Sequence, residues 1–203
     1  MMTQTNTKTY HQFINGRWVP SSSGKLDKIL NPTNEEVIGQ VQEGSESDAI
    51  LALEAAQQAQ KEWRKLPPIQ RANILRKFVA EIKANETRLA ELLVREQGKL
   101  LTVAKMEVAV TCSFIEYACE WARRIEGDIV SSDNPNEQIW IQKVPRGVVV
   151  AITAWNFPLA LAGRKLGPAL VAGNTLVIKP TPAAPLATLE LCDLAQRAGI
   201  PDG

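Results

Sequence analysis

Residues 148–180, VVVAITAWNFPLALAGRKLGPALVAGNTLVIKP, constrain most strongly what this chain can fold into. A β-branched apolar run leads through a short turn into an apolar helical segment, and a second β-branched run follows. Two strands joined by one helix pair in parallel, with a right-handed crossover. The sequence therefore predicts an α/β fold, in which strands near 148–152 and 175–179 are buried on both faces.

Two helices belong to this unit. The first is predicted over 159–171, where Pro168 interrupts it and bends its axis. The second is predicted over 186–198 and is closed by Gly199. The result is a βαβα unit with short turns.

Ligands of parallel sheets bind beyond the carboxyl ends of the strands. In this chain those ends are residues 153–156 and 179–182, so the aromatic turn Trp155-Asn156-Phe157-Pro158 and Lys179 are predicted to lie side by side. Large aromatics are not needed to make a turn, which indicates a functional role for this one. The glycine fingerprint of a dinucleotide site is absent from both turns.

The first part of the chain predicts hairpins followed by helices. Asn15-Gly16 and Asn31-Pro32 are hairpin and turn signals between β-prone runs. Pro68 suits the first turn of a helix, and Asn85 is predicted to cap the next one, which stops at Gly98. The predicted apolar stripes are Ala49, Ala52, Ala56, Ala59 and Trp63; Ala72, Leu75, Val79 and Ile82; Leu89, Leu92 and Leu93; and Val103, Met106, Val110, Phe114, Tyr117 and Trp121, the last helix ending at Gly127. We expect the aromatic end of the last stripe to lie in the core.

A polar turn cluster, SSDNPNE, precedes the strand QIWIQKV. Trp140 stands between Ile139 and Ile141, so both faces of this strand carry large apolar groups. That pattern predicts a surface that another subunit covers.

The composition limits the class of protein. The chain has 203 residues, of which 45% are hydrophobic and 22% charged, and its formal net charge is +1. Because it has no basic block, we expect no nucleic-acid partner. No apolar run is long enough to span a bilayer, and the polar start MMTQTNTKTY lacks the apolar core of a secretory signal. These features predict a cytoplasmic protein without a membrane partner.

The chain has three cysteines, Cys112, Cys119 and Cys192, at spacings that match no metal site. We expect buried structural thiols in a reducing cytosol. The only histidine, His11, lies in the polar leader. Histidine-based catalysis and a metal site are therefore not expected.

The segment WNFPLALAGRKLGPALVAGNTLVIKP resembles the signature region of the aldehyde dehydrogenase superfamily. The resemblance extends to FINGRWV, NPTNEEVIGQV, WRKLPPIQRANILRKF and EYACEWARRIEGDIV, and it covers the chain from about Phe13 to Gly203. Within the superfamily, EWARRIEGDIVSSD and GRKLGPAL are most similar to lactaldehyde or glycolaldehyde dehydrogenases.

The resemblance implies an architecture in three parts. Residues 1–126 would form strands and helices of the cofactor domain, 127–146 an oligomerisation β-arm, and 147–203 the first βαβα part of a Rossmann-like NAD(P)-binding sheet. It also implies dimers or tetramers. Members of the family oxidise aldehydes to carboxylic acids through a cysteine thiohemiacetal, with hydride transfer to NAD(P) and hydrolysis assisted by a glutamate.

By this resemblance, the side-chain amide of Asn156 donates to the oxyanion of the transition state. A fixed donor at such a site is worth about 2.7–4 kcal/mol. From the residues alone, an asparagine that caps the following helix is the preferred interpretation, whereas the whole motif favours the donor. One side chain cannot easily serve both purposes.

The resemblance also assigns cofactor-binding positions. Backbone from Ile152 through Thr153 and Ala154 to Trp155 would line the cofactor cleft, and Lys179 would bind the adenosine ribose beside Thr181 and Pro182. Arg164 could meet a polar or anionic substrate tail, although a surface ion pair is as good an interpretation, and Lys165 would lie beneath the site.

Two departures from the family pattern concern the cofactor turns. Ala154 replaces a common proline, which frees the turn. Pro182 replaces a glutamate that holds both ribose hydroxyls and repels a 2′-phosphate. We therefore expect NAD as cofactor and leave NADP open.

None of the three cysteines lies in the motif of the family nucleophile. By resemblance the nucleophile, the glutamate base and the glycine-containing cofactor turn lie beyond the end of this chain. We therefore expect an incomplete, N-terminal portion of an aldehyde dehydrogenase. One hypothesis is the enzyme of which the chain is a part; the other is a non-catalytic nucleotide-binding or assembly module, and the 203-residue chain alone is expected to be inactive.

Overall fold

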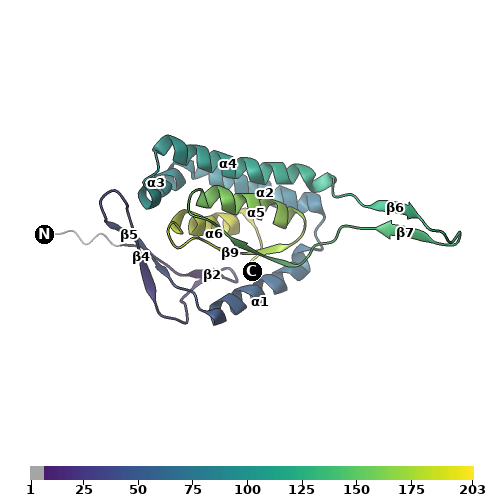
Figure 1. The fold of residues 1–203 in the computed structure, drawn as a ribbon, viewed down its shortest axis with the longest axis horizontal. Helices are drawn as coiled ribbons and strands as arrows, with labels where there is room; N and C mark the ends of the chain where they lie inside the picture. Colours follow the sequence, from purple (N-terminus) through teal and green to yellow (C-terminus); the bar gives the residue numbers. More distant parts are fainter. Residues whose placement is uncertain (1–6) are drawn as a thin grey trace.

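The computed structural model describes residues 7–203; the predicted absence of a secretory signal falls largely on residues 1–6, outside the described part. Helices form the body of the molecule, small sheets of N-terminal strands lie at one end, and a two-stranded arm extends from the other (Figure 1). The helices are α1 (Glu46–Trp63), α2 (Pro68–Ala84), α3 (Glu86–Gln97), α4 (Leu101–Glu120), α5 (Pro158–Val171) and α6 (Leu186–Ala198), with a 3-10 turn at Trp121–Arg123. The strands are β1 (Thr9–Tyr10), β2 (Gln12–Ile14), β3 (Arg17–Val19), β4 (Leu26–Leu30), β5 (Val37–Gln42), β6 (Asp128–Ser131), β7 (Gln138–Ile141), β8 (Val148–Ile152) and β9 (Thr175–Lys179).

The N-terminal strands confirm the two turn predictions. β2 and β3 form an antiparallel hairpin, and Asn15 and Gly16 both have positive φ between them, as a tight hairpin turn requires. β4 pairs antiparallel with β5 around the second turn, and β1 adds a parallel strand on the other side of β5. The order of this sheet is β1-β5-β4.

Local signals set most of the helix ends. Ser45 and Asp48 form a reciprocal capping box at the start of α1. Pro68 is the first residue of α2 as predicted, and Gly98 ends α3 in the left-handed conformation. Asn85 is the N-cap residue of α3 as predicted, but its side chain makes no capping hydrogen bond there, and its amide donates to the Glu81 carbonyl of α2 instead.

The core lies between the helices, where α4 packs against α2, α3 and α5. The predicted stripe of α2 is buried, and so is Trp63 at the end of α1. None of the helices within residues 7–203 is long and apolar enough to cross a membrane.

The predicted face of α4 is wrong. Met106, Tyr117 and Trp121 are about half exposed, and the α-helix ends at Glu120 rather than at Gly127. The helix buries another face instead, made of Ala104, Glu107, Val108, Thr111, Cys112, Ile115, Ala118 and Cys119. Because α4 is apolar on nearly all sides, helical periodicity alone could not decide which face packs.

At the C-terminus of α5, backbone carbonyl groups accept hydrogen bonds from side chains of earlier helices. At its C-terminus, Trp63 Nε1 donates to the Leu170 carbonyl at 3.0 Å, and Arg71 Nε donates to the Val171 carbonyl at 3.0 Å. Burial lowers the pKa of the Arg71 guanidinium. The helix continues through Pro168, so the prediction that this proline interrupts it is wrong.

β8 and β9 pair in parallel as predicted, from Val148 opposite Thr175 to Ile152 opposite Lys179. The predicted burial of both faces is wrong for β8, since Val150 is 54% and Ile152 is 65% exposed. The helices α1 and α5 pack on this two-stranded sheet, and they leave one face of β8 open at its carboxyl end.

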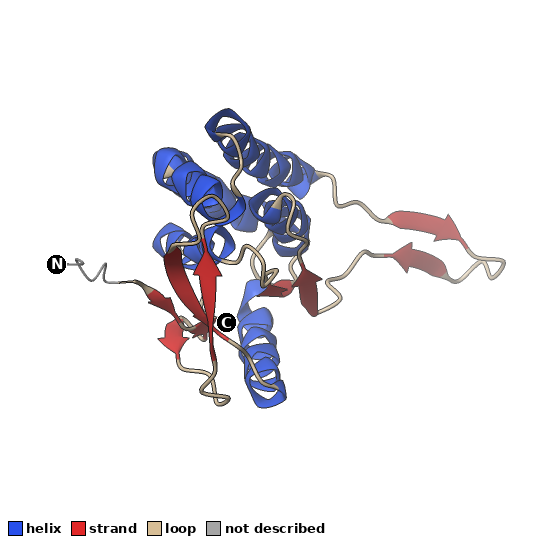
Figure 2. Ribbon diagram, turned by 60° about the vertical axis from the view of Figure 1, so that its left-hand side comes forward, coloured by secondary structure: helices blue, strands red, loops and turns tan. Residues whose placement is uncertain are grey.

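The arm consists of β6 and β7, which pair antiparallel from Asp128 opposite Ile141 to Ser131 opposite Gln138. Every residue of both strands is exposed. Figures 1 and 2 show the arm projecting well away from the helical body. The arm therefore presents its apolar side chains to solvent.

Candidate active site

The turn after β8 and the segment after β9 lie side by side, as the sequence predicted. Ile152 is the register partner of Lys179, and Thr153 N–H donates to the Lys179 carbonyl at 3.2 Å. Residues far apart in the sequence thus meet at the carboxyl edge of the parallel strands, where ligands of such sheets bind.

This edge is accessible. Ile152, Ala154, Trp155 and Asn156 are exposed, and Trp155 is 67% exposed. Thr153 is buried between them, and its Oγ1 has no hydrogen-bond partner among the described residues. A buried hydroxyl without a partner is costly.

Asn156 does not cap α5. Phe157 occupies the N-cap position without a side-chain hydrogen bond. The carboxylate of Glu107 on α4 accepts instead from the N–H groups of Leu159 at 2.9 Å and Ala160 at 3.3 Å. The interpretation of Asn156 as a helix cap is therefore wrong, and its carboxamide makes no hydrogen bond to any of residues 7–203.

On the β9 side, Lys179 is exposed and its Nζ donates to the Pro180 carbonyl at 3.3 Å. Thr181 is buried, and its Oγ1 accepts from Ala183 N–H at 3.4 Å. Pro182 is exposed. Within residues 7–203, Lys179 forms no ion pair, so the positive charge at this edge has no acidic partner in the described chain.

Arg164 is exposed on α5, with its guanidinium carbon 5.6 Å from the centre of the Phe114 ring. No carboxylate of the described chain pairs with it, contrary to the alternative of a surface ion pair. Lys165 beside it is half-buried. Arg164 therefore makes a cation–aromatic contact with Phe114 of α4.

The three thiols are free. Burial raises the pKa of Cys112 to about 11 and that of Cys192 to about 12, and it also raises the pKa of Cys119. Thiols of this kind are poor nucleophiles. Among residues 7–203, no group of histidine, cysteine and acidic side chains is arranged to hold a metal ion.

Residues 18–203 match the aldehyde dehydrogenase family. The chain belongs to the aldehyde dehydrogenase family.

Two curated aldehyde dehydrogenases illustrate the similarity. The 3,6-anhydro-α-L-galactose dehydrogenase of Vibrio sp. (strain EJY3) is 60% identical over 97% of this chain and 41% of its own length. The lactaldehyde dehydrogenase of Escherichia coli (strain K12) is 41% identical over 94% of this chain and 40% of its own. The chain thus spans about two fifths of the length of the relatives that it matches.

Solved aldehyde dehydrogenases share its fold. A structure of 3,6-anhydro-L-galactose dehydrogenase in complex with NADP matches 96% of this chain and 41% of that one, with a TM-score of 0.94 and 60% identity. A structure of the Escherichia coli lactaldehyde dehydrogenase matches 97% of this chain and 41% of that one, with a TM-score of 0.93 and 40% identity.

Four polar residues beside this edge were not predicted from the sequence: Glu96, Gln97, Lys99 and Glu107. Gln97 Nε2 donates to the Trp155 carbonyl, and Lys99 Nζ donates to the Asn156 carbonyl at 3.0 Å. The sequence alone did not single out Glu107, because the periodicity of α4 did not indicate which of its faces is buried. A charged residue on a buried helix face requires a partner.

A second carboxylate, that of Glu96, accepts hydrogen bonds from the first N–H groups of α6, as Glu107 does at α5. Glu96 accepts from the N–H groups of Leu186 at 2.8 Å and Ala187 at 3.1 Å. Burial raises the pKa of Glu96 to about 7, against the effect of these two hydrogen bonds. The N-termini of α5 and α6 are thus both occupied by side chains of the protein itself.

Proposed function

We propose that the full-length gene product oxidises an aldehyde to a carboxylic acid and reduces NAD or NADP. Family membership supports the reaction class. The observation that carries the proposal is the free carboxamide of Asn156 on an exposed turn at the carboxyl edge of β8 and β9.

Asn156 would act as the oxyanion donor. When a nucleophile adds to an aldehyde, negative charge develops on the carbonyl oxygen, and a donor fixed near that oxygen stabilises the transition state by about 2.7–4 kcal/mol. The carboxamide has two N–H bonds for this purpose. Because Glu107 already satisfies the start of α5, using Asn156 in this way leaves no helix N–H group without a partner.

The residues at this edge fit a nicotinamide cofactor. Backbone from Ile152 to Trp155 would line its cleft, and the buried Thr153 hydroxyl offers an unused polar atom. Lys179, beside Thr181 and Pro182, would hold the ribose. The nicotinamide, when bound, accepts the hydride that the aldehyde carbon loses.

We further propose that NADP is accepted. Pro182 offers no carboxylate to repel a 2′-phosphate, while the cationic Lys179 is exposed nearby and has no ion-pair partner in the described chain. The relative that is 60% identical has been solved with NADP, which supports this proposal.

The proposed substrate class is 2-hydroxyaldehydes. Lactaldehyde and the open-chain form of 3,6-anhydrogalactose both carry a hydroxyl beside the aldehyde, and these compounds name the two relatives compared above. Arg164 would face the polar tail of the substrate, since it is exposed and forms no ion pair with the described residues.

Steady-state kinetics of the full-length gene product tests this function. The substrates would be 3,6-anhydro-L-galactose, L-lactaldehyde, succinate semialdehyde and an unsubstituted alkanal of similar size, each with NAD and with NADP. We expect the highest kcat/KM for a hydroxyaldehyde and a loss of about 10²-fold or more in kcat for Asn156→Ala. No reduction of either cofactor with any of these aldehydes would refute the proposal.

A further inference from the structure

The start of α5 is satisfied entirely without Asn156. Helices leave their first N–H groups without internal partners. In α5, Pro158 has no N–H, and Leu161 N–H already donates to the Phe157 carbonyl at 2.9 Å. The N–H groups of Leu159 and Ala160 remain, and Glu107 accepts from both.

Glu107 is itself held firmly. It is fully buried on α4, and its second oxygen pairs with Lys99 Nζ, whose side chain is only 11% exposed. A buried carboxylate needs such a partner, since an unpaired one would be strongly destabilising. The ion pair thus orients the Glu107 carboxylate toward the start of α5.

The same pair also holds the turn before the helix. Lys99 Nζ donates to the Asn156 carbonyl at 3.0 Å and lies 4.2 Å from the centre of the Phe157 ring. Gln97 holds the preceding carbonyl, that of Trp155. Contacts from the α3–α4 region thus fix the backbone on both sides of Asn156.

The consequence falls on the Asn156 side chain. An asparagine just before a helix commonly accepts from the N–H groups of its first turn, but here both groups are taken. Its exposed carboxamide makes no hydrogen bond within residues 7–203. The side chain is therefore free, while its backbone is fixed.

We propose that Glu107 and Lys99 are positioning residues for Asn156, which keep its carboxamide available by taking over the capping of α5. This inference rests on the proposed function of Asn156 as oxyanion donor. Without Glu107, the Leu159 and Ala160 N–H groups would lack a partner, and the Asn156 oxygen would turn toward them. The amide would then be withdrawn from the substrate.

A double-mutant cycle in the full-length gene product tests this. We expect Glu107→Leu to lower kcat at least about tenfold, bounded by the 10²–10³-fold loss that removal of an oxyanion donor causes, with the KM for cofactor unchanged. In the Asn156→Ala background, the same substitution should change kcat less than about twofold. Glu107→Gln, which keeps an acceptor for the two N–H groups, should restore most of kcat.

Two further variants complete the design. Lys99→Met removes the contact to the Asn156 carbonyl. It should lower kcat in the wild-type background and leave kcat nearly unchanged in the Asn156→Ala background. This variant keeps the test valid if Glu107→Leu does not fold. Glu116→Gln is the matched control, because Glu116 is on the same helix and pairs with Lys83 at the surface, 2.6 Å away; its kcat should equal the wild-type value.

If Glu107→Leu or Lys99→Met lowers kcat by the same factor in the Asn156→Ala background as in the wild type, the inference is wrong. The proposed function would then still stand. An unchanged kcat in a folded Glu107→Leu variant would overturn the inference in the same way. A wild-type protein that oxidises no aldehyde would overturn the proposed function, and this inference with it.

Discussion

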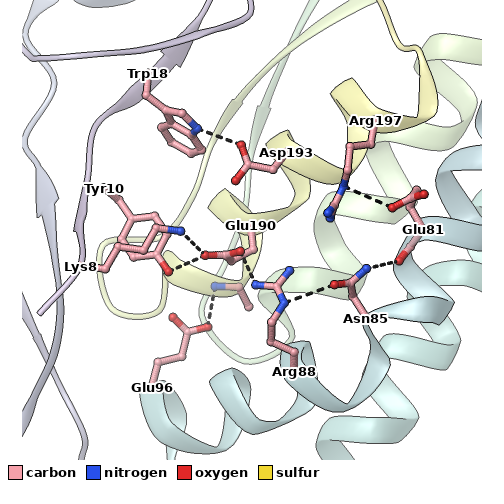
Figure 3. A network of polar contacts seen from close by, with 11 residues as sticks. Lys8, Tyr10, Trp18, Glu81, Asn85, Arg88, Glu96, Glu190, Asp193 and Arg197 are labelled. Carbon is pink, nitrogen blue, oxygen red and sulfur yellow. Dashed lines mark hydrogen bonds and ion pairs between the residues drawn. The ribbon is translucent and has the colours of Figure 1, made fainter. Parts of the chain in front are cut away.

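The carboxylate of Glu190 on α6 accepts a hydrogen bond from the Tyr10 hydroxyl at 2.6 Å, although 180 residues separate the two in sequence. Lys8 donates to the same carboxylate at 2.6 Å, and Arg88 donates to its other oxygen. Figure 3 shows these side chains converging from the first strand, α3 and α6. Glu190 thus ties the N-terminal strand to the helical body.

The environment of Glu190 makes the free energy of unfolding depend on pH. Burial opposes its ionisation, but the hydrogen bonds from Lys8, Tyr10 and Arg88 outweigh burial and lower its pKa from 4.5 to about 2. Because the pKa is lower in the folded state, the stabilisation is present above pH 4.5 and is lost as the pH falls through about 2. At about 1.4 kcal/mol per pKa unit, this is worth up to about 3 kcal/mol.

We therefore predict that Glu190→Gln lowers the free energy of unfolding by about 2–3 kcal/mol at pH 7. The difference from wild type should shrink as the pH falls from 4.5 toward 2, because the wild-type carboxylate becomes protonated too. Urea unfolding of the dilute 203-residue chain at several pH values measures this. Glu62→Gln, at an exposed pair with Lys65, is the control; a Glu190→Gln effect of the same size at pH 2.5 and pH 7 would contradict the prediction.

Glu96 predicts the opposite pH dependence. Burial raises its pKa from 4.5 to about 7, so the folded state binds its proton more tightly than the unfolded state. The associated stability is complete below pH 4.5 and is lost as the pH rises through about 7. We compare the unfolding free energy of Glu96→Gln with that of wild type. We predict that the difference, variant minus wild type, increases by up to about 3 kcal/mol when the pH rises from about 4.5 to about 8.

The same urea experiment checks this, with the exposed Glu91→Gln on α3 as the matched control. Glu91→Gln should shift the unfolding free energy equally at both pH values. A Glu96→Gln difference that does not change with pH would show that Glu96 is ionised as readily in the folded chain as in the unfolded one.

Local patterns predicted much of this fold but not its polar contacts. Asn15-Gly16, Pro68, Gly98 and Gly199 act on neighbouring residues, and the structure has turns or helix ends at each. The carboxyl edge of β8 and β9 followed from parallel pairing. Glu107, in contrast, acts on N–H groups 52 and 53 residues away, and no local pattern encodes such a distance.

Isolated strands and helices also mislead when their neighbours are unknown. The β-branched run of β8 indicates burial on both faces, yet Val150 and Ile152 are exposed because nothing in residues 7–203 covers them. In the same way, α4 has apolar residues such as Met106 and Tyr117 outside its packed face. Hydrophobicity predicts that a surface will be covered, and tertiary packing decides by what.

We predict that Pro182→Glu in the full-length gene product shifts cofactor preference from NADP toward NAD. A carboxylate at this exposed position would repel a 2′-phosphate near Lys179, and a repulsion of about 1.4 kcal/mol corresponds to tenfold. The ratio of kcat/KM for the two cofactors measures the shift. Asn136→Glu adds the same charge on the distant arm as a control; a Pro182→Glu variant with the wild-type ratio would be evidence against a cofactor ribose at this position.

The 203-residue chain by itself is predicted not to reduce NAD or NADP with any aldehyde. Cys112 and Cys192, with pKa values of about 11 and 12, would be thiolate in only about one molecule in 10⁴ or fewer at pH 7. Absorbance of the reduced nicotinamide after adding hydroxyaldehyde provides the assay. Aldehyde-dependent turnover that Asn156→Ala abolishes would contradict this prediction.

The last prediction concerns the arm. Ile129 and Trp140 stand opposite each other in the β6–β7 ladder and are 66% and 63% exposed. Val130 and Ile139 form a second exposed pair, and alternation along the strands places this pair on the other face. Apolar pairs on both faces of a projecting hairpin predict that the arm is covered by another copy of the chain.

Trp140→Lys should therefore weaken self-association. An aromatic side chain buries 150–250 Å², which at about 25 cal/mol per Å² amounts to roughly 4–6 kcal/mol, so we expect the dissociation constant to rise at least about 100-fold. Gln138→Lys is the matched control, because it adds the same charge on the same strand and face without removing apolar surface. Light scattering over a range of concentrations measures the assembly. A wild-type chain that stays monomeric at high concentration, or a Trp140→Lys variant that assembles as the wild type does, would mean that the arm is not the contact surface.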